Sequence, residues 1–355
     1  MALRSLLTGG RIKPAGQYSD DFRFCQEYLA KVSRTFSLNI SVLHGDVYRA
    51  VLLAYLLCRI ADILEDEDHF SPNFKVQKLL QYSDLFPPAK EYRSRIALFL
   101  EDITFPEETD YAVLLMNSRR VFDETVSLPD RMIAVISQYV REMAAGMAGF
   151  QQRNADRPIA FLEDQQELEQ YCYYVAGTVG RMLTGLFAAG SKKITAPIEE
   201  ELRKHSVAFG LGLQITNIVK DFFGDRERGW YYIPRSFFLE AGVDPIQDSI
   251  AQNPKAFYAV QERIIAIALE YLDEALQYTL KMPRTLVRYR IFCLWPLFMA
   301  VETLSKLHQA QSVLDPHVVK LSRDELKHIM ATTALAAMSN QTLIQMYQTA
   351  RDQIT

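Results

Sequence analysis

The stretch AVLLAYLLCRIADILED, residues 50–66, runs from a strongly apolar segment directly into negative charge. Its apolar residues recur at three- and four-residue spacing, which is typical of a helix buried on most of its surface. Five carboxylates occupy the seven positions from Asp62 to Asp68. Carboxylates at a helix C-terminus oppose the macrodipole, and like charges four residues apart repel each other. Either this helix end is solvated, or the charge is retained because it holds a metal ion.

The helical spacing of apolar residues continues along the chain, and strand-like alternation is scarce. The expected helices cover residues 21–32, 46–66, 89–102, 109–125, 129–153, 162–190, 197–223, 254–281, 283–311 and 323–354. Ser322 precedes the last of them with the pattern of a capping box. We therefore predict an N-terminal tail over residues 1–20 and one all-α domain over residues 21–355. Many long helices favour a bundle around a central space over a solenoid of short repeats.

The composition is that of an ordinary globular protein, with 49% hydrophobic residues and a net charge of −4. No basic field indicates a nucleic-acid partner, so we expect none. The four cysteines lie far apart in apolar surroundings, which predicts buried, reduced thiols. The N-terminus has no apolar core of a signal peptide, and no apolar run is long enough to span a membrane. These features predict a cytoplasmic protein.

A second acidic pair, Asp221 and Asp225, repeats the spacing of Asp62 and Asp66 late in another long apolar helix. Residues four apart lie on one face of a helix, so each pair presents two carboxylates together. Mg²⁺ commonly takes one or two carboxylates, several waters and substrate phosphate oxygens. A solvated acidic face is the alternative interpretation of each pair. Glu65, with Glu67 and Asp68, is expected to be an outer-shell or solvated charge rather than a ligand.

Basic and amide side chains flank both acidic pairs. They are Arg59, Asn217, Lys220, Arg226 and Arg228. Carboxylates alone would repel a phosphate, whereas a mixture of aspartate and cations can bind a metal ion and an oxyanion together. Ordinary surface ion pairs, each of small energy, would give the same spacing. Spacing alone leaves both interpretations open.

Four segments resemble the squalene and phytoene synthase family, which joins prenyl groups head to head. They are VSRTFSLNI (32–40), YLLCRIADILEDED (55–68), YCYYVAGTVGRMLTGLF (171–187) and LGLQITNIVKDFFGD (211–225). They follow the family's order, and weaker similarity continues to about residue 330. The resemblance implies a class I isoprenoid synthase bundle around a deep apolar cavity. It also implies that the two aspartate motifs face each other across the mouth of that cavity.

By matching position, the resemblance assigns roles to individual residues. Mg²⁺ bridged to a prenyl diphosphate would be held by Asp62, Asp66, Asn217, Asp221 and Asp225, and the four aspartates are counted as catalytic. Residues implied to bind the substrate are Ser33, Arg34, Phe36, Arg59, Ala176, Gly177, Gly180, Gln214, Asn217, Lys220 and Arg228. Tyr55 and Tyr171 match tyrosines near the reacting carbons, and Tyr171 is the candidate proton relay.

The small residues Ala176, Gly177 and Gly180 also stand out without the resemblance, because they lie on one side of an otherwise bulky helix. Glycine inside a helix is destabilising relative to alanine, so it marks either close packing or room for a ligand. Both interpretations remain open.

The family member is harder to predict. FCLWP (292–296) resembles squalene synthases, which implies two farnesyl diphosphates, a presqualene diphosphate intermediate and a hydride from NADPH. RGWYYIPRSFFLEAGVD (228–244) instead resembles bacterial phytoene- and presqualene-type enzymes, and Gly224 replaces the usual glutamate. Our hypothesis is squalene synthesis, with the alternatives of a dehydrosqualene, presqualene diphosphate or phytoene synthase. A terpene cyclase, a chain-elongating prenyltransferase and a non-enzymatic helical scaffold are the more distant alternatives.

NADPH, if used, would bind without a Rossmann motif, since no GxGxxG follows a strand. Candidate cofactor residues are Phe292, Cys293, Lys320 and Arg323. For Lys320 and Arg323 a charge pair at a helix start is the preferred interpretation. We expect a monomer whose partner is the prenyl diphosphate substrate. The apolar product is compatible with peripheral contact to a membrane.

Overall fold

The computed structural model describes residues 18–155, 159–249, 252–310 and 319–354. Within these residues the structure is helical, apart from two short parallel strands, β1 (Ala160–Phe161) and β2 (Trp230–Tyr231). The predicted all-α class is therefore confirmed. The chain divides into two compact units, one of Met1–Ala155 with Arg181–Thr195 and one of Asp156–Gly180 with Ala196–Thr355. Whether these two units together form the single domain predicted over residues 21–355 stays a prediction.

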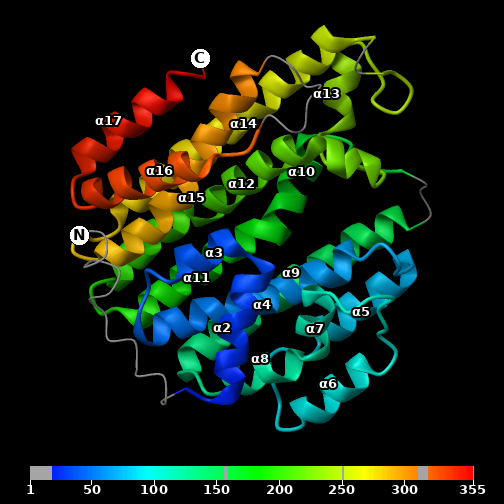
Figure 1. The fold of residues 1–355 in the computed structure, drawn as a ribbon, viewed down its shortest axis with the longest axis vertical. Helices are drawn as coiled ribbons and strands as arrows, with labels where there is room; N and C mark the ends of the chain where they lie inside the picture. The colour runs from blue at the N-terminus through cyan, green and yellow to red at the C-terminus, as the bar shows by residue number, and fades with distance from the viewer. Residues whose placement is uncertain (1–17, 156–158, 250–251, 311–318, 355) are drawn as a thin grey trace. The chain divides into compact units, whose positions relative to one another are not determined.

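The first unit is built around α4 (Gly45–Asp66). The other helices are α2 (Asp20–Val32), α3 (Arg34–Ile40), α5 (Pro72–Ser83), α6 (Tyr92–Leu100), α7 (Asp110–Met116), α8 (Ser118–Thr125), α9 (Asp130–Asn154) and the larger part of α11 (Thr178–Gly190). Helices α2, α8 and α9 pack on α4 (Figure 1). Its apolar residues from Ala50 to Leu57 are buried apart from Tyr55. Burial on nearly all sides explains why the helix has little amphipathic pattern.

Two helices of the first unit have no counterpart among the predicted elements. Helix α3 has only seven residues. Helix α5 turns the side chains of Lys75 and Lys78 into the interior, where both are buried. The Lys78 ammonium lies 5.5 Å from the ring centroids of both Phe74 and Phe99. Because lysines occupy inward positions, the apolar periodicity that predicts a helix is hidden there.

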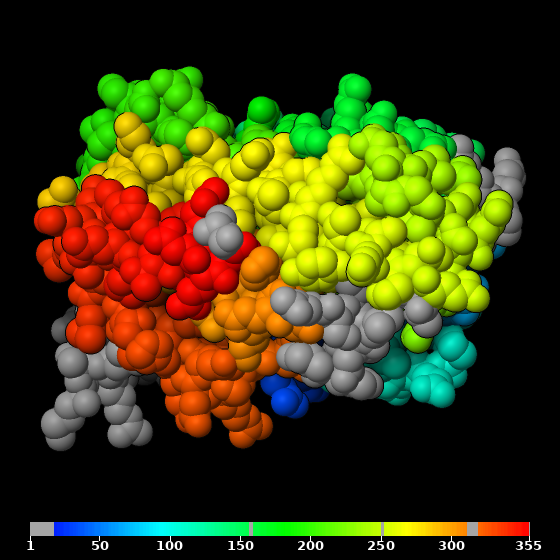
Figure 2. Space-filling view, turned by 90° about the horizontal axis from the view of Figure 1, so that it is seen from above, coloured from blue at the N-terminus to red at the C-terminus, as the bar shows by residue number. Residues whose placement is uncertain are grey.

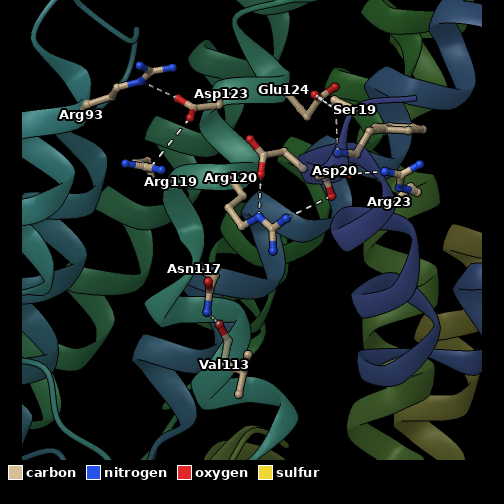
Figure 3. Close-up of polar contacts among 12 residues, drawn as sticks. Ser19, Asp20, Arg23, Arg93, Val113, Asn117, Arg119, Arg120, Asp123 and Glu124 are labelled. Carbon is tan, nitrogen blue, oxygen red and sulfur yellow. Dashed lines mark hydrogen bonds and ion pairs between the residues drawn. The ribbon is translucent and has the colours of Figure 1, made fainter. Parts of the chain in front are cut away.

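The single helix predicted over residues 109–125 is wrong at Asn117, where α7 ends and α8 begins. The Asn117 amide donates to the Val113 carbonyl at 2.9 Å, which is a local alternative to helix continuation (Figure 3). Helix α8 also anchors the start of α2. Arg120 binds the Asp21 carboxylate at 2.6 Å and the Asp20 carbonyl at 3.0 Å.

The second unit is a layered set of helices around α12 (Ala196–Glu227), which packs along α14 (Pro254–Lys281). Its other elements are α10 (Gln165–Cys172), the π-helical turn η1 (Tyr173–Gly177), α13 (Arg235–Glu240), α15 (Val287–Gln309), α16 (Arg323–Ala336) and α17 (Asn340–Arg351). Helix α17 lies against α14 (Figure 2). The Tyr347 hydroxyl donates to the Asp273 carboxylate at 2.9 Å, and Arg351 binds the same carboxylate at 3.1 Å.

The helix over residues 254–281 and the Ser322 capping box are confirmed. The predicted helices 162–190 and 323–354 are wrong in their continuity, because the first contains η1 and the second is broken between α16 and α17. The break follows from Arg290, a buried arginine of α15 that donates to the Ala337 carbonyl at 2.6 Å and to the Asn340 amide oxygen at 2.7 Å. The last position of the predicted helix 283–311 lies outside the described residues.

All four cysteines are free and buried, as predicted. Burial raises the pKa of Cys58, Cys172 and Cys293 well above the usual value. These thiols are therefore inert at neutral pH. In the described part of the chain, none of the helices combines the length and apolar character that crossing a bilayer requires.

Candidate active site

The first acidic motif is formed by the last turns of α4. The Arg59 guanidinium lies 3.1 Å from an Asp62 carboxylate oxygen and donates to the Tyr55 hydroxyl at 2.9 Å. The Phe36 ring of α3 packs on the Tyr55 ring, with 5.2 Å between the centroids. Four of the predicted site residues are thus brought into one continuous row that runs from an aromatic pair to a carboxylate.

The two aspartates of this motif have different surroundings. The Asp62 side chain is 29% exposed, whereas Asp66, the last residue of α4, is exposed. Burial raises the pKa of Asp62 to about 6; Arg59 lowers this pKa and Asp66 raises it. Asp62 is therefore mostly ionised at neutral pH, but it binds a proton far more readily than an ordinary aspartate.

Glu65 is not a solvated charge, and that part of the sequence interpretation is wrong. Its side chain is buried, and burial together with the nearby Asp66 and Asp62 raises its pKa to about 8. Gln151 of α9 hydrogen-bonds to the Glu65 side chain. The buried Lys75 of α5 donates to the Glu65 backbone carbonyl at 2.6 Å. The end of α4 is thereby fixed to two neighbouring helices.

Lys75 and Gln151 were missed because they lie in other helices and carry no local motif. Burial lowers the pKa of Lys75, and the carboxylates of Asp66 and Glu65 oppose this shift. A buried ammonium beside a carboxylate-rich helix end compensates part of the unfavourable charge there.

Residues 32–40, the first of the four segments that resemble the family, also have a structural role. Ser33 is the N-cap of α3, and its hydroxyl accepts from the Phe36 backbone N–H at 3.2 Å. Arg34 is exposed in the first turn of α3, and Phe36 is 39% exposed. The capping hydrogen bond explains Ser33 without a substrate, so its predicted substrate contact stays a prediction.

The second acidic motif lies in the last turns of α12. The Lys220 ammonium is 3.2 Å from an Asp221 carboxylate oxygen and 3.3 Å from the Asn217 amide oxygen. The Asp221 side chain is 55% exposed, whereas that of Asp225 is 10% exposed and pairs with Arg228. These predicted residues therefore form a second mixed group of carboxylates and cations.

Two neighbours of this group behave differently. Gln214, two turns earlier in α12, is half-buried. Arg226 donates to the Tyr231 hydroxyl at 3.1 Å. Part of the basic character that the sequence shows around Asp225 is therefore engaged with an aromatic residue.

The small residues Ala176, Gly177 and Gly180 allow η1 and the start of α11 to approach the backbone of α12. A Cβ atom on Gly180 would lie 1.9 Å from the Ser206 carbonyl oxygen, and one on Gly210 would lie 2.2 Å from the Ala176 carbonyl oxygen. No side chain fits at such distances. Close packing thus accounts for both glycines, while substrate contact by Ala176, Gly177 and Gly180 stays a prediction. Single π-helical turns are frequent at functional sites.

Tyr171 ends a column of aromatic rings. Its ring stacks on Tyr232 with 4.8 Å between centroids, and Tyr232 stacks on Trp230 with 5.5 Å between centroids. Tyr171 is buried, and the other two are half-buried. Tyr232 and Trp230 were missed as site candidates, although they lie in the segment 228–244 for which the sequence shows a family resemblance.

The cofactor candidates have contrasting environments. Phe292 and Cys293 are buried in α15, whereas Lys320 and Arg323 are exposed near the start of α16. At that start Ser322 and Glu325 form a capping box. Helix-start chemistry, the interpretation preferred from the sequence, fits this arrangement, and binding of a cofactor by these four residues stays a prediction.

The acidic motifs offer pairs of carboxylates rather than a complete metal site. In residues 18–155, 159–249, 252–310 and 319–354, no three His, Cys, Asp or Glu side chains converge as metal ligands. Mg²⁺ needs only one or two carboxylates when phosphate oxygens and waters complete its octahedron, so each pair fits an ion shared with a diphosphate. The two motifs belong to different units, so the expectation that they face each other stays a prediction.

Comparison with known proteins gives consistent matches. A family model described as squalene/phytoene synthase matches residues 29–325. The chain is 27% identical to rat squalene synthase over 315 residues, which cover 88% of this chain and 70% of the relative. It is 29% identical to human squalene synthase over 304 residues, which cover 83% of this chain and 66% of the relative. The chain thus spans about two thirds of the length of these relatives.

Two solved structures share the fold. The structure of TcSQS with a ligand matches with a TM-score of 0.79 at 24% identity, over 95% of this chain and 92% of that chain. A dehydrosqualene synthase in complex with a ligand matches with a TM-score of 0.62 at 20% identity, over 94% of this chain and all (100%) of that chain. These similarities confirm the predicted all-α isoprenoid synthase fold.

Proposed function

Because the chain belongs to the squalene/phytoene synthase family of prenyl-joining transferases, we propose that it is a Mg²⁺-dependent squalene synthase. It would join two farnesyl diphosphates head to head through presqualene diphosphate and reduce the product to squalene. One observation carries the proposal: each of two helices ends in an aspartate pair whose first member is bonded to a cation. The distances are 3.1 Å for Arg59 with Asp62 and 3.2 Å for Lys220 with Asp221.

The reaction begins when a carbon–oxygen bond to diphosphate breaks and leaves an allylic cation. Asp62 and Asp66, and Asn217, Asp221 and Asp225, are the residues that would hold Mg²⁺, which would supply positive charge to stabilise the departing diphosphate. Arg59 and Lys220 add donors beside the same carboxylates, where the negative charge develops. Arg34 and Arg228 are exposed cations on the corresponding segments and fit contact with the diphosphate.

The carbocation must be shielded from water, and the rings of Phe36 and Tyr55 serve this purpose. Phe36 and Tyr55 lie next to Arg59, so an allylic tail beside them meets ring faces close to the diphosphate. Ring faces stabilise cations by about 0.5–2 kcal/mol. Tyr171, held by its stack on Tyr232, is our candidate for passing the departing proton to diphosphate.

The residues fit NADPH in part. Lys320 and Arg323 are exposed cations that suit a cofactor phosphate, whereas Phe292 and Cys293 are buried and can line a site only through apolar contacts. NADPH would supply the hydride for the final reduction.

Product analysis by mass spectrometry tests the proposal. The full chain is incubated with Mg²⁺ and either farnesyl diphosphate or geranylgeranyl diphosphate, with and without NADPH. We expect squalene from farnesyl diphosphate only when NADPH is present. A product from geranylgeranyl diphosphate alone would replace the proposal by a phytoene synthase, and the absence of a joined product from both substrates would refute it.

A sister activity is favoured by one feature. The segment that follows the second motif, residues 228–244, resembles bacterial phytoene- and presqualene-type enzymes rather than squalene synthases. Dehydrosqualene formed without NADPH, or presqualene diphosphate that accumulates with NADPH present, would assign the chain to that branch.

A further inference from the structure

Two helix–helix turns of the second unit form a surface of unusual composition. The end of α14 and the turn to α15 carry Lys281 and Arg284, and the end of α16 and the turn to α17 carry Leu335 and Met338. All four side chains are exposed, Leu335 to 75% and Met338 to 59%. We refer to these four residues as the turn surface. Exposed apolar side chains rimmed by polar ones mark interaction sites.

One buried arginine holds the two turns together. Arg290 donates to the Met282 and Thr279 carbonyls of the first turn, both at 2.8 Å, and to the Ala337 carbonyl of the second at 2.6 Å. Lys281 directly precedes Met282, and Met338 directly follows Ala337. The cations and the apolar side chains therefore emerge from adjoining segments. Figure 1 shows α14 to α17 side by side, with these two turns at the same end.

Negative charge is absent from the sequence of both segments. Residues 275–301 contain no aspartate or glutamate, and neither do residues 326–351. Lys281 lies 3.9 Å from a carboxylate oxygen of Glu201 in α12, which also pairs with Lys204. The protein as a whole is acidic, with a net charge of −4, so these two segments are a local exception in its sequence.

We propose that the turn surface docks the protein onto an anionic lipid bilayer. Lys281 and Arg284 would meet the headgroups, while Leu335 and Met338 would enter the boundary between headgroups and acyl chains. The charge argues for this partner. Two copies of the chain meeting through the same patch would bring like charges together. A polynucleotide would use the cations but leave the exposed aliphatic side chains without a role. The inference does not rest on the proposed function, because docking requires no substrate.

Vesicle flotation of the full chain, without substrate, tests the proposal. The probes are vesicles of phosphatidylcholine alone and of phosphatidylcholine with phosphatidylserine in equal parts. We expect binding to the second kind that weakens as salt is added. The double variant Lys281→Gln with Arg284→Gln should lower the affinity about 25-fold, since each charge contributes about fivefold. Leu335→Ser with Met338→Ser should also release the protein.

Matched controls lie elsewhere in the second unit. Lys255→Gln removes an exposed cation from the first turn of α14, and Leu239→Ser removes a side chain that is 52% exposed in α13. Both should bind vesicles like the wild type, and the unfolding midpoints of all variants should agree.

The proposal would be refuted if the wild-type protein did not bind vesicles that contain phosphatidylserine, or if the turn-surface variants bound them as the wild type does. A shift in the sedimentation of lipid-free protein caused by Leu335→Ser would assign the surface to self-association instead. Product formation measured separately keeps these outcomes distinct from failure of the proposed function.

Discussion

The two acidic motifs share one sequence spacing but distribute their burial in opposite order. In α4 the first aspartate, Asp62, is largely buried and the second, Asp66, is exposed. In α12 the first aspartate, Asp221, is 55% exposed and the second, Asp225, is 10% exposed. The same i, i+4 pattern therefore gives two different electrostatic environments, because the position of each helix in its own unit decides which carboxylate loses water.

The motifs also differ in how their charge is balanced. Helix α4 ends at Asp66, so both carboxylates lie at the negative end of the helix dipole. The positive charges of Arg59 and of the buried Lys75 compensate part of this unfavourable negative charge. At the second motif the cations Lys220 and Arg228 are half-exposed or exposed. Interactions in the first motif are therefore less screened by water and salt, and removal of its cation should have a larger effect than removal of the cation in the second motif.

The largest expected effect is loss of turnover on neutralising the first aspartate of either motif. Asp62→Asn and Asp221→Asn should each lower kcat about 10³-fold while leaving the protein folded, because metal-assisted stabilisation of the departing diphosphate is lost. Steady-state kinetics at saturating Mg²⁺ and circular dichroism check this. Asp68→Asn is the matched control, since Asp68 is an exposed carboxylate of the same acidic run. Full turnover by Asp62→Asn would break the metal assignment.

The next comparison concerns the cations. Arg59→Gln should lower kcat/KM about 10²-fold, whereas Lys220→Gln should lower it only about tenfold, since water and salt screen the exposed pair. The pH profile adds a second readout. Burial holds the pKa of Asp62 at about 6, and Arg59 lowers it. Loss of the Arg59 cation raises the pKa of Asp62 further, so a proton competes with Mg²⁺ for this carboxylate at higher pH. The acid limb of the kcat/KM profile should therefore move to higher pH.

The pH readout separates electrostatics from simple damage to the fold. Lys220→Gln should leave the acid limb where the wild type has it. Equal shifts of the limb in both variants would mean that burial does not distinguish the two motifs.

A smaller effect, on stability, is expected at Lys75. Lys75→Met removes the donor of a buried carbonyl at the end of α4, which should cost about 1–3 kcal/mol in the free energy of unfolding. The matched change in the second motif is Lys220→Met, which should stay within about 0.5 kcal/mol of wild type because that side chain is half-exposed. Urea denaturation of the metal-free protein measures both. If Lys75→Met were as stable as Lys220→Met, Lys75 would not be needed to hold the end of α4 in place.

Helix class and both aspartate pairs could be predicted because they depend on local periodicity and spacing. Helix α14 was predicted to the residue, since Pro254 begins it and a long apolar stripe fills it. Breaks that depend on tertiary partners could not be predicted. The stop after α16 depends on a guanidinium that lies 47 residues away in sequence from Ala337.

The candidate site shows the same division. Arg59 and Asp62 are three residues apart on one helix, so their pairing follows from helix geometry. The burial of Glu65 does not, because Gln151 and Lys75 reach it from α9 and α5. Nor does the stack of Tyr171 on Tyr232, which joins two separate segments.

The smallest expected effect is at Gly224, which lies inside the second motif. A Cβ added there would meet no atom within 4 Å, so Gly224→Ala should raise the free energy of unfolding by about 1 kcal/mol through helix propensity alone, with turnover unchanged. Gly180→Ala is the contrasting variant, because its Cβ would overlap the Ser206 carbonyl and destabilise the protein. Urea denaturation and kcat are measured for both. If Gly224→Ala is more stable yet loses turnover, backbone freedom between Asp221 and Asp225 is part of catalysis, a requirement absent from the first motif, where the buried Glu65 holds the equivalent place.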